Sequence, residues 1–190
     1  MCSARLAVDK WSCPSMPPRA RLTIIVTCAT VSETIIRRAT PADLATIGRL
    51  GAMLVRVHYE FDTKRFIPPT PQTPKGYGSF LGTQLDDPDV CVLVAERRGD
   101  VIGYTYAGVE SADWMSLRGP AGVLHDIIVD PAQRGAGVGR QLLEATLAFL
   151  KSRGVPRVVL STAERNEAAQ RLFEKAGFRR TMIEMTRELD

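Results

Sequence analysis

The chain has 190 residues, 45% of which are hydrophobic, and a formal net charge of +4 at pH 7. A chain of this length buries one core, so a single domain is the default, and its apolar runs are shorter than the ~18 residues that a membrane-spanning helix needs. Most of the net positive charge falls in residues 1–30, which leaves no basic surface of the kind that binds nucleic acid.

The four cysteines follow no pattern of a known site. Cys2, Cys13, Cys28 and Cys91 form no C-x-x-C pair, and no histidine stands at zinc-ligand spacing from them. The sequence therefore predicts neither a metal site nor a redox pair. Free cysteines fit a reducing cytoplasm best.

Residues 1–30 differ in composition from the rest of the chain. Three closely spaced prolines precede an apolar stretch at 22–31. A secretion signal fits poorly, because the basic region before that stretch is long and cleavage-type small residues are weak. We expect a disordered or loosely docked extension here, with a secretion signal or an overlong assigned start as alternatives, and a folded domain over 31–190.

The first half of that domain reads as a strand, a helix, a loop and a shorter helix, followed by a β-hairpin. Pro41 and Asp43 open the first helix, closely spaced prolines mark the loop, and Gly99 with Asp100 separates two β-rich runs. These elements are predicted at residues 34–40, 41–58, 68–74, 79–85, 90–98 and 101–109.

The second half alternates strands and helices after a loop at 114–122. Pro131 stops the first strand, and Gly154 and Gly177 cap the two helices. The strands are predicted at residues 123–130, 157–162 and 179–187, and the helices from about 140 to 153 and at 166–177. The whole pattern predicts an α/β fold, a single domain with a mixed, mostly antiparallel central sheet and helices on both faces.

A glycine-rich turn, QRGAGVG at 133–139, joins a strand to a helix. Glycines let successive N–H groups converge on one point, and the helix dipole adds partial positive charge there. The turn therefore suits a phosphate, although an ordinary tight turn is the alternative. It is no Walker loop, and it lacks the fuller G-x-G-x-x-G pattern of a dinucleotide site.

Two linked motifs carry a family resemblance. Arg134, Gly137 and Gly139 spell R-x-x-G-x-G, and residues 166–178 spell N-x-x-A-x-x-L-F-x-x-x-G-F. Together they resemble the acetyl-CoA-binding motifs of the GNAT superfamily of N-acetyltransferases, whose order of elements residues 34–187 also match. The resemblance implies the GNAT-like acyl-CoA acyltransferase fold and an enzyme that transfers an acetyl group from acetyl-CoA to a primary amine, by direct attack in a ternary complex.

The same resemblance implies a set of cofactor-binding residues. A strand backbone would pair with the pantetheine arm of acetyl-CoA, the glycine turn would hold its pyrophosphate, and Asn166 would contact it unless it serves only as a helix N-cap. The implied residues are Ile127, Ile128, Val129, Arg134, Gly135, Ala136, Gly137, Val138, Gly139, Arg140, Asn166, Ala169 and Phe173.

Acetyl transfer needs a base, because an alkyl amine has a pKa near 10. His125 stands where many relatives carry a glutamate, and a neutral imidazole is a competent base at pH 7. The alternative is a strand residue without catalytic contact. We expect Asp126 on the opposite face, and the N–H of Val129 could polarise the thioester oxygen.

Phe173 departs from the family pattern. Many relatives carry a tyrosine there that is thought to protonate the departing thiolate, which a phenyl ring cannot do. Water, Ser161 or Thr162 remain as donors, and a thiolate leaves tolerably without one. Phe173 also fits the alternative function, a non-catalytic acyl-CoA-binding sensor or regulatory module with the same fold.

The resemblance places the acceptor pocket among the first helix, the loop after it and the hairpin. Aromatic and acidic groups there suit a cation, whereas Arg65 suits a carboxylate; packing or solvated surface is the alternative for each residue. The candidates are His58, Phe61, Asp62, Arg65, Tyr104 and Tyr106, with Tyr59, Glu110 and Trp114 nearby. The expected partners are acetyl-CoA and a small-molecule or peptide amine, without metal, nucleic acid or membrane; monomer and homodimer stay open.

Overall fold

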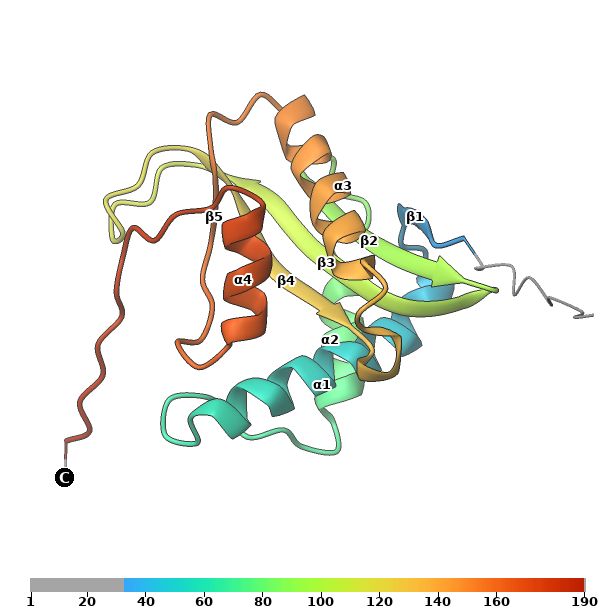
Figure 1. Cartoon of the computed structure of the whole chain (residues 1–190), viewed down its shortest axis with the longest axis horizontal. Helices are drawn as coiled ribbons and strands as arrows, with labels where there is room; N and C mark the ends of the chain where they lie inside the picture. The colour runs from blue at the N-terminus through green and yellow to red at the C-terminus, as the bar shows by residue number, and fades with distance from the viewer. Residues whose placement is uncertain (1–32, 190) are drawn as a thin grey trace, which may run out of the picture. The chain divides into compact units, whose positions relative to one another are not determined.

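The computed structural model of the chain describes residues 33–189 (Figure 1). The predicted N-terminal extension, with its alternatives, lies outside the described residues. The elements are β1 (Ile35–Arg38), η1 (Pro41–Asp43), α1 (Leu44–Phe61), α2 (Thr73–Gly82), β2 (Val90–Arg97), β3 (Asp100–Glu110), β4 (Ala121–Val129), η2 (Pro131–Gln133), α3 (Val138–Ser152), β5 (Val158–Leu160) and α4 (Glu167–Lys175), where η denotes a 3-10 turn.

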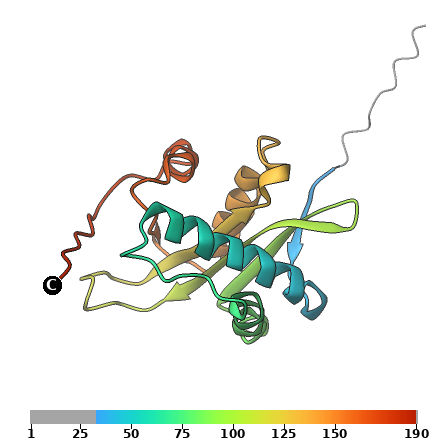
Figure 2. The ribbon, with the colours of Figure 1, turned by 90° about the horizontal axis from the view of Figure 1, so that it is seen from below.

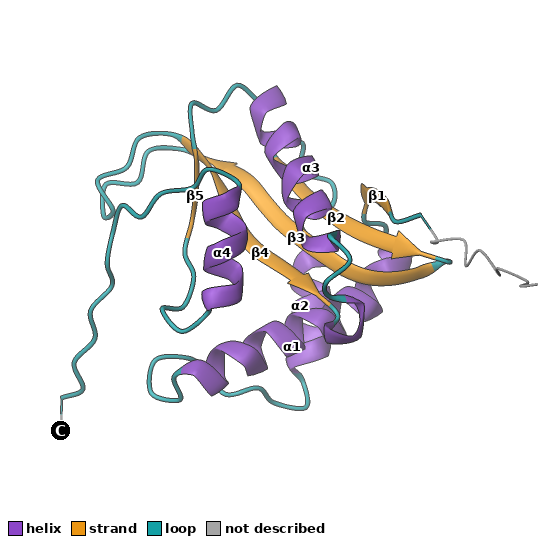
Figure 3. Cartoon of the chain, in the orientation of Figure 1, coloured by secondary structure: helices purple, strands orange, loops and turns teal. Residues whose placement is uncertain are grey.

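The five strands form one sheet in the order β1-β2-β3-β4-β5 (Figure 3). All neighbours are antiparallel except β4 and β5, which are parallel. The predicted mixed, mostly antiparallel sheet is therefore confirmed. The hairpin turn differs by one residue from the prediction: Asp100 already pairs with Arg97, and Arg98 and Gly99 make the turn with φ of +56° and +85°, as a two-residue loop requires.

Helices cover both faces of the sheet, as predicted. One core, under α3 and α4, includes Leu124, Leu142 and Phe173, and the other, under α1 and α2, includes Ile47, Tyr104 and Ile128. Figure 2 shows α1 and α2 on one side of the strands and α3 and α4 on the other. The three central strands, β2, β3 and β4, thus each contribute side chains to both cores.

The second helix begins earlier than the sequence prediction of 79–85. α2 starts at Thr73, with Pro74 in its first turn, where proline is well tolerated because its missing N–H has no helical partner. α1 and α2 then touch backbone to backbone: a Cβ on Gly78 would lie 2.7 Å from the carbonyl oxygen of Leu44. Only glycine fits such an approach.

The last predicted strand, 179–187, is not formed. Residues 179–189, called the tail below, carry no regular structure and are exposed along their whole length (Figure 3). The edge strand that precedes them in the chain, β5, has only three residues. A strand without a neighbour to hydrogen-bond has no ladder to stabilise it.

A buried carboxylate fixes the corner between β1 and α1. Asp43 accepts hydrogen bonds from both Nη atoms of Arg37, at 2.8 and 2.9 Å, and from the backbone N–H of Thr40 at 2.8 Å. The Arg37 guanidinium in particular lowers the pKa of Asp43 from 3.8 to about 2. The carboxylate is therefore charged and paired at neutral pH.

Candidate active site

β4 and β5 are paired over only part of their length. The parallel pairing joins Gly122, Val123 and Leu124 to β5, which ends at Leu160. Beyond it, β4 up to Val129 has β3 on one side and no strand on the other among residues 33–189. Figure 1 shows β4 running on past β5 toward the turn before α3.

The unpaired side of β4 offers backbone groups to a ligand. Successive residues of a strand present N–H and C=O alternately to its two sides. The N–H of Asp130 donates to a carbonyl oxygen of β3 at 2.9 Å, so the groups of Val129 point the other way. There the Nε of Arg134 donates to the Val129 carbonyl oxygen at 3.1 Å. By the same alternation Ile127 faces the unpaired side, whereas the backbone of Ile128 faces β3.

The turn before α3 leaves a row of N–H groups without acceptors. Gly135 and Gly137 have φ of +85° and +78°, which glycine adopts without strain, and α3 begins at Val138. From Gly135 to Arg140, no backbone N–H has a protein acceptor within the described residues. Free N–H groups at the N-terminus of a helix, with its dipole behind them, favour a phosphate.

The two motif regions meet at one point of the fold. A Cβ built on Gly139 would lie 3.6 Å from Leu172 on α4 and 3.7 Å from Val129 on β4. On α4, Phe173 is buried and its ring packs edge-on against Phe178, with centroids 5.8 Å apart. The end of β4, the start of α3 and the inner face of α4 therefore surround one region.

Asn166 caps α4. Its side-chain oxygen accepts the N–H of Ala169 at 3.2 Å, which is the N-cap role that the sequence left as an alternative. Ala169 is half-buried against the core under α3. Further along the turn, Ala136 and Arg140 are exposed, and Arg140 pairs with Glu144 on the next turn of α3 at 2.7 Å.

His125 is the extra residue of a β-bulge. Tyr106 pairs with Asp126 and Ala107 with Leu124, which leaves His125 without an opposite residue on β3. Leu124 belongs to the core under α3, whereas Ile128, four residues on, belongs to the core under α1 and α2. An even separation would keep both on one face in a regular strand, so the bulge changes the face that β4 presents.

The bulge places His125 among aromatic and charged groups. Its ring stacks on Tyr106, with centroids 4.7 Å apart and an interplanar angle of 23°. Nε2 lies 3.3 Å from Oε1 of Glu110, whose Oε2 accepts a hydrogen bond from Nη2 of Arg118 at 2.7 Å. The imidazole side chain is 34% exposed, so a reactant can reach it.

Asp126 lies on the same face as His125, not on the opposite face as predicted. Its Oδ2 accepts hydrogen bonds from the hydroxyls of Tyr77, at 2.8 Å, and of Tyr104, at 3.0 Å. Tyr104 and Tyr106 are two residues apart on one strand and share the core under α1 and α2. The bulge is the physical reason for the error, because it gives consecutive residues the same orientation.

Burial is the largest influence on the pKa values of Asp126, Tyr77 and Tyr104. It raises the pKa of Asp126, while the two tyrosine hydroxyls oppose that rise. Burial, together with the charge of Asp126, also raises the pKa of both Tyr77 and Tyr104. The two phenols are consequently hydrogen-bond donors that stay protonated at neutral pH.

Four acceptor candidates gather at the end of α1. His58 bonds the Leu54 carbonyl oxygen through Nδ1 at 2.9 Å, and its ring packs edge-on against Phe61. Asp62 accepts the N–H groups of the two residues that follow Thr63, which lower its pKa. Arg65 forms an ion pair with Glu184 of the tail.

The two hairpin candidates differ in access. Tyr104 is completely buried, and its hydroxyl is used by Asp126. Tyr106 is partly exposed, packs edge-on against Phe80 at 5.7 Å and donates its hydroxyl toward Gln84 at 3.4 Å. Tyr106, beside His125, is therefore the hairpin aromatic that an acceptor can touch.

Sequence reasoning missed Tyr77, Arg118 and the part that Glu110 plays. Tyr77 was hidden by the late start predicted for α2. The contacts of Glu110 with His125 and Arg118 depend on the bulge, which no residue pattern in β4 announces. The sequence offered one indirect signal for this cluster: His125 on one predicted strand and the alternating Tyr104 and Tyr106 on the strand before it.

Among residues 33–189, no group of three or more His, Cys, Asp or Glu side chains could hold a metal ion. No helix in that range has the length and apolar character needed to cross a membrane.

Comparison with protein families gives one match that covers most of the chain. The profile described as "Acetyltransferase (GNAT) family" matches residues 56–178. A mycothiol acetyltransferase of Thermobispora bispora is 42% identical over 97 residues, which are 49% of this chain and 31% of that protein. An uncharacterized N-acetyltransferase of Bacillus subtilis, YhfO, is 29% identical over 55% of this chain and 68% of its own length. The chain thus spans about a third of the mycothiol acetyltransferase.

Solved structures share the fold. A mutant of the BH1408 protein from Bacillus halodurans aligns with a TM-score of 0.70 and 24% identity, over 82% of this chain and 99% of that one. A predicted acetyltransferase from Clostridium acetobutylicum, solved with acetyl-CoA, aligns with a TM-score of 0.60 and 17% identity, over 81% of this chain and 96% of that one.

Proposed function

Because the chain belongs to the GNAT acetyltransferase family, we propose that it transfers an acetyl group from acetyl-CoA to a primary amine of a small molecule or peptide, within a ternary complex. The observation that carries the proposal is the combination of an unpaired β4 edge with the row of free N–H groups from Gly135 to Arg140. The extended pantetheine arm of acetyl-CoA carries amide groups that need the strand edge, and the pyrophosphate at its end needs the row of N–H groups.

The chain holds acetyl-CoA through its backbone. Ile127 and Val129 pair with the amides of the pantetheine arm, in the manner of an added strand, once the guanidinium of Arg134 releases the Val129 carbonyl. The N–H groups from Gly135 to Arg140 hold the pyrophosphate. Ala169 and Phe173 on α4 supply the apolar wall, and the amide nitrogen of Asn166 stays available beside it.

Acetyl-CoA supplies a thioester: the nitrogen of the neutral amine bonds to its carbonyl carbon, the carbon–sulfur bond breaks, and CoA leaves as a thiolate that takes a proton from water. His125 takes the proton that the amine loses, directly or through water. Glu110 then faces a positive imidazolium across 3.3 Å, which stabilises that charge. The N–H of Val129, on the unpaired side of β4, polarises the thioester oxygen.

The acceptor enters beside His125. Tyr106 and Phe80 supply aromatic surface, and Glu110 supplies negative charge; together they favour a cationic amine over an anion. The cluster of His58, Phe61 and Arg65 at the end of α1 forms another wall of the pocket. Several relatives are named mycothiol acetyltransferases, so primary amines related to mycothiol belong in any panel of acceptors.

Titration with acetyl-CoA, followed by thiol release with that panel, tests the proposal. Gly137→Glu fills and repels the phosphate seat, and we expect it to abolish binding. Gly154→Glu is the matched control, because Gly154 has φ of +75°, lies at the other end of α3 and has open space around its Cβ. Both variants carry the same backbone strain. Equal binding by the two would refute the placement of the pyrophosphate, and binding without turnover on any amine would leave the sensor alternative.

A further inference from the structure

The loop that joins β3 to β4 is held together by its own hydrogen bonds. It covers residues 111–119 and is called the hairpin tip below. Within it, Asp113 and Arg118 exchange two backbone hydrogen bonds of 2.8 Å each. The Asp113 carboxylate also accepts the Met115 N–H at 2.9 Å and the Ser116 hydroxyl at 2.7 Å. These bonds fix the backbone of the hairpin tip at Arg118.

The hairpin tip also contains a strained residue. Leu117, directly before Arg118, has a φ of +50°, which is unfavourable for a residue with a side chain. Such strain persists where surrounding contacts hold it, and it occurs most often at functional sites. The neighbour of the strained residue is the one that points inward, because the Arg118 side chain is only 14% exposed.

The guanidinium of Arg118 holds the carboxylate of Glu110, the last residue of β3. Nη2 donates to Oε2 at 2.7 Å, a length typical of a charge-assisted hydrogen bond, and Nη1 donates to the carbonyl oxygen of Gly119 at 3.4 Å. A glutamate at the end of a strand has several rotamers of similar energy. The bond to Arg118 selects among them and leaves Oε1 of Glu110 for another partner.

That partner is His125. Oε1 of Glu110 lies 3.3 Å from Nε2 of the imidazole, whose ring stacks on Tyr106. Tyr106, Gly108 and Glu110 share one face of β3, and Gly108 has no side chain to block the reach from Glu110 to the ring. A carboxylate beside one ring nitrogen favours the proton on that nitrogen. Nδ1 of His125 is therefore the nitrogen with a free lone pair.

The other histidine of the chain is held in the opposite way. The sequence has two histidines, and Nδ1 of His58 lies 2.9 Å from the carbonyl oxygen of Leu54. A carbonyl oxygen only accepts hydrogen bonds, so this Nδ1 carries the proton and Nε2 has the lone pair. The two neutral imidazoles are thus expected as opposite tautomers, and His58 provides an internal reference for His125.

We propose that Arg118, fixed by the hairpin tip, is a positioning residue for His125: it orients Glu110, and Glu110 keeps the proton of His125 on Nε2, with Nδ1 open to the acceptor. This role rests on the proposed function, in which His125 takes the proton of the amine. The N–H bond of the amine breaks, its electron pair stays on nitrogen, and the lone pair of Nδ1 binds the proton. Water later takes that proton from Nδ1. Glu110 stays a carboxylate throughout, and Arg118 touches no reactant.

Nitrogen NMR of the histidine rings in the full chain gives the first test, because it reads the tautomers without turnover. His58→Gln assigns the two sets of ring signals. At a pH where both rings are neutral, we expect the Nε2–H form for His125 and the Nδ1–H form for His58. Arg118→Met should turn His125 into a mixture of both forms and leave His58 unchanged.

Glu110→Gln provides a second variant, which keeps Arg118 in place. It should change the His125 signals in the same way, so the test does not depend on the folding of one variant. An Nδ1–H form at His125 in the wild-type chain would overturn the proposal. Wild-type His125 signals in either variant would overturn it too.

Kinetics decides whether Arg118 acts through Glu110. We expect Arg118→Met to lower kcat about tenfold, with an unchanged dissociation constant for acetyl-CoA, and Arg118→Lys to restore part of the loss. In the enzyme with both Glu110→Gln and Arg118→Met, the loss should equal that of Glu110→Gln alone, because residues of one network are not additive. Losses that add up would show that Arg118 acts by another route.

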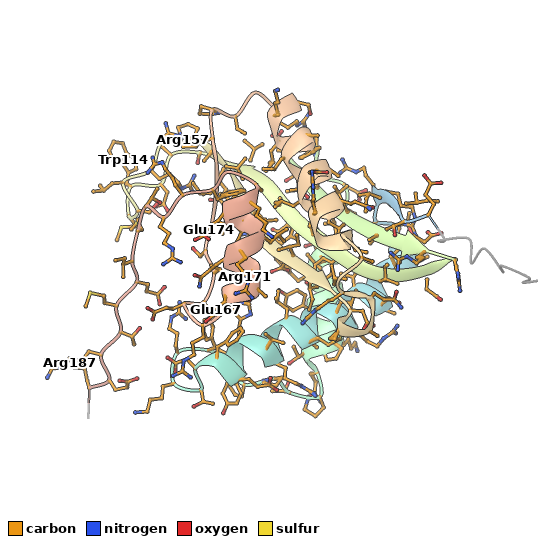
Figure 4. All side chains as sticks on the ribbon, in the orientation of Figure 1. Trp114, Arg157, Glu167, Arg171, Glu174 and Arg187 are labelled. Carbon is orange, nitrogen blue, oxygen red and sulfur yellow. The ribbon has the colours of Figure 1, made fainter. Side chains whose placement is uncertain are left out.

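Arg171→Met is the matched control. Arg171 pairs with Glu167 on the same helix at 3.1 Å, and Figure 4 shows both on α4, well apart from Trp114 in the hairpin tip. This variant also loses one arginine–glutamate pair, and it should leave kcat and both tautomers unchanged. A similar loss of kcat in it would reject a specific role for Arg118. A chain that acetylates no amine would refute the proposed function, while the tautomers would still decide the role of Arg118.

Discussion

Single residues of the site owe their surroundings to backbone that the sequence does not reveal. The resemblance predicted His125 as the base, and the structure gives it Tyr106 and Glu110 as neighbours. The alternation of side chains along a strand predicted that Asp126 would lie on the face opposite His125, but the bulge places both on the same face. The glycine turn could be read from its residues because glycine at positive φ has a direct sequence signature. The bulge in β4 has no such sequence signature, because its extra residue is a histidine and not a glycine.

Glu110 and His125 should act as a unit. We expect His125→Ala to lower kcat by ~10² or more and Glu110→Gln to lower it about tenfold, because the amide no longer stabilises the imidazolium. The dissociation constant for acetyl-CoA should stay unchanged in both. Asp100→Asn, at the other end of β3, serves as the control. Additive losses in the doubly substituted enzyme would contradict the coupling, and a wild-type rate for His125→Ala across pH 6 to 9 would remove it as the base.

Phe173→Tyr tests whether a proton donor is missing. The new hydroxyl should speed thiol release, because a donor near the sulfur stabilises the leaving thiolate. The side chain at 173 is buried, so the same hydroxyl should lower the melting temperature by a few degrees. Phe178→Tyr adds a hydroxyl to the ring packed against it and should bring the thermal cost without the gain. Stopped-flow thiol detection and thermal unfolding measure the two effects.

Whole elements were predictable where local signals agreed with packing. The β2–β3 hairpin, β4, α3 and α4 follow from turn residues and apolar periodicity. The predicted start of α2, residue 79, is too late. Pro74 favours a loop in the sequence, but in the structure it lies in the first turn of the helix. The strand expected at 179–187 had the right composition, but strand formation depends on a partner edge, and the sequence of one element does not contain its partner.

The corner between β1 and α1 should make stability depend on pH. The pKa of Asp43 falls from 3.8 in an unfolded chain to about 2, so its contribution is complete above pH ~4 and is lost as the pH falls through ~2. This lowering of the pKa is worth roughly 2 to 3 kcal/mol. Asp43→Asn should therefore reduce the free energy of unfolding by roughly that amount at pH 6, and the gap to wild type should close toward pH 2. Denaturant titrations at several pH values measure it.

A control separates this effect from general charge loss. Asp86 is exposed and makes no hydrogen bond among the described residues, so Asp86→Asn should leave the stability and its pH dependence unchanged. Parallel curves for wild type and Asp43→Asn between pH 6 and 2 would contradict the role of the Arg37–Asp43 pair.

For the molecule as a whole, the length of the chain predicted one core, whereas the sheet separates two cores within residues 36–178. We propose on this basis that the acetyltransferase domain comprises residues 31–190 and that residues 1–30 are an appendage.

Removal of residues 1–30 should leave the domain intact. We expect the shortened chain to keep the melting temperature, the affinity for acetyl-CoA and the oligomeric state of the full chain, since both cores are built from residues within 36–178. Calorimetry, titration and light scattering on both chain lengths check this. Loss of acetyl-CoA binding in the shortened chain would mean that the appendage is part of the enzyme.

The bulge at His125 makes β4 a strand with a phase shift in the middle. Before the bulge the even-numbered Leu124 faces the core under α3, and after it the even-numbered Ile128 faces the core under α1 and α2. Substituting His125 therefore changes one side chain, whereas deleting it would resynchronise the strand and exchange the inner and outer faces of everything on one side. In this strand the number of residues is therefore under a stricter structural constraint than their identity.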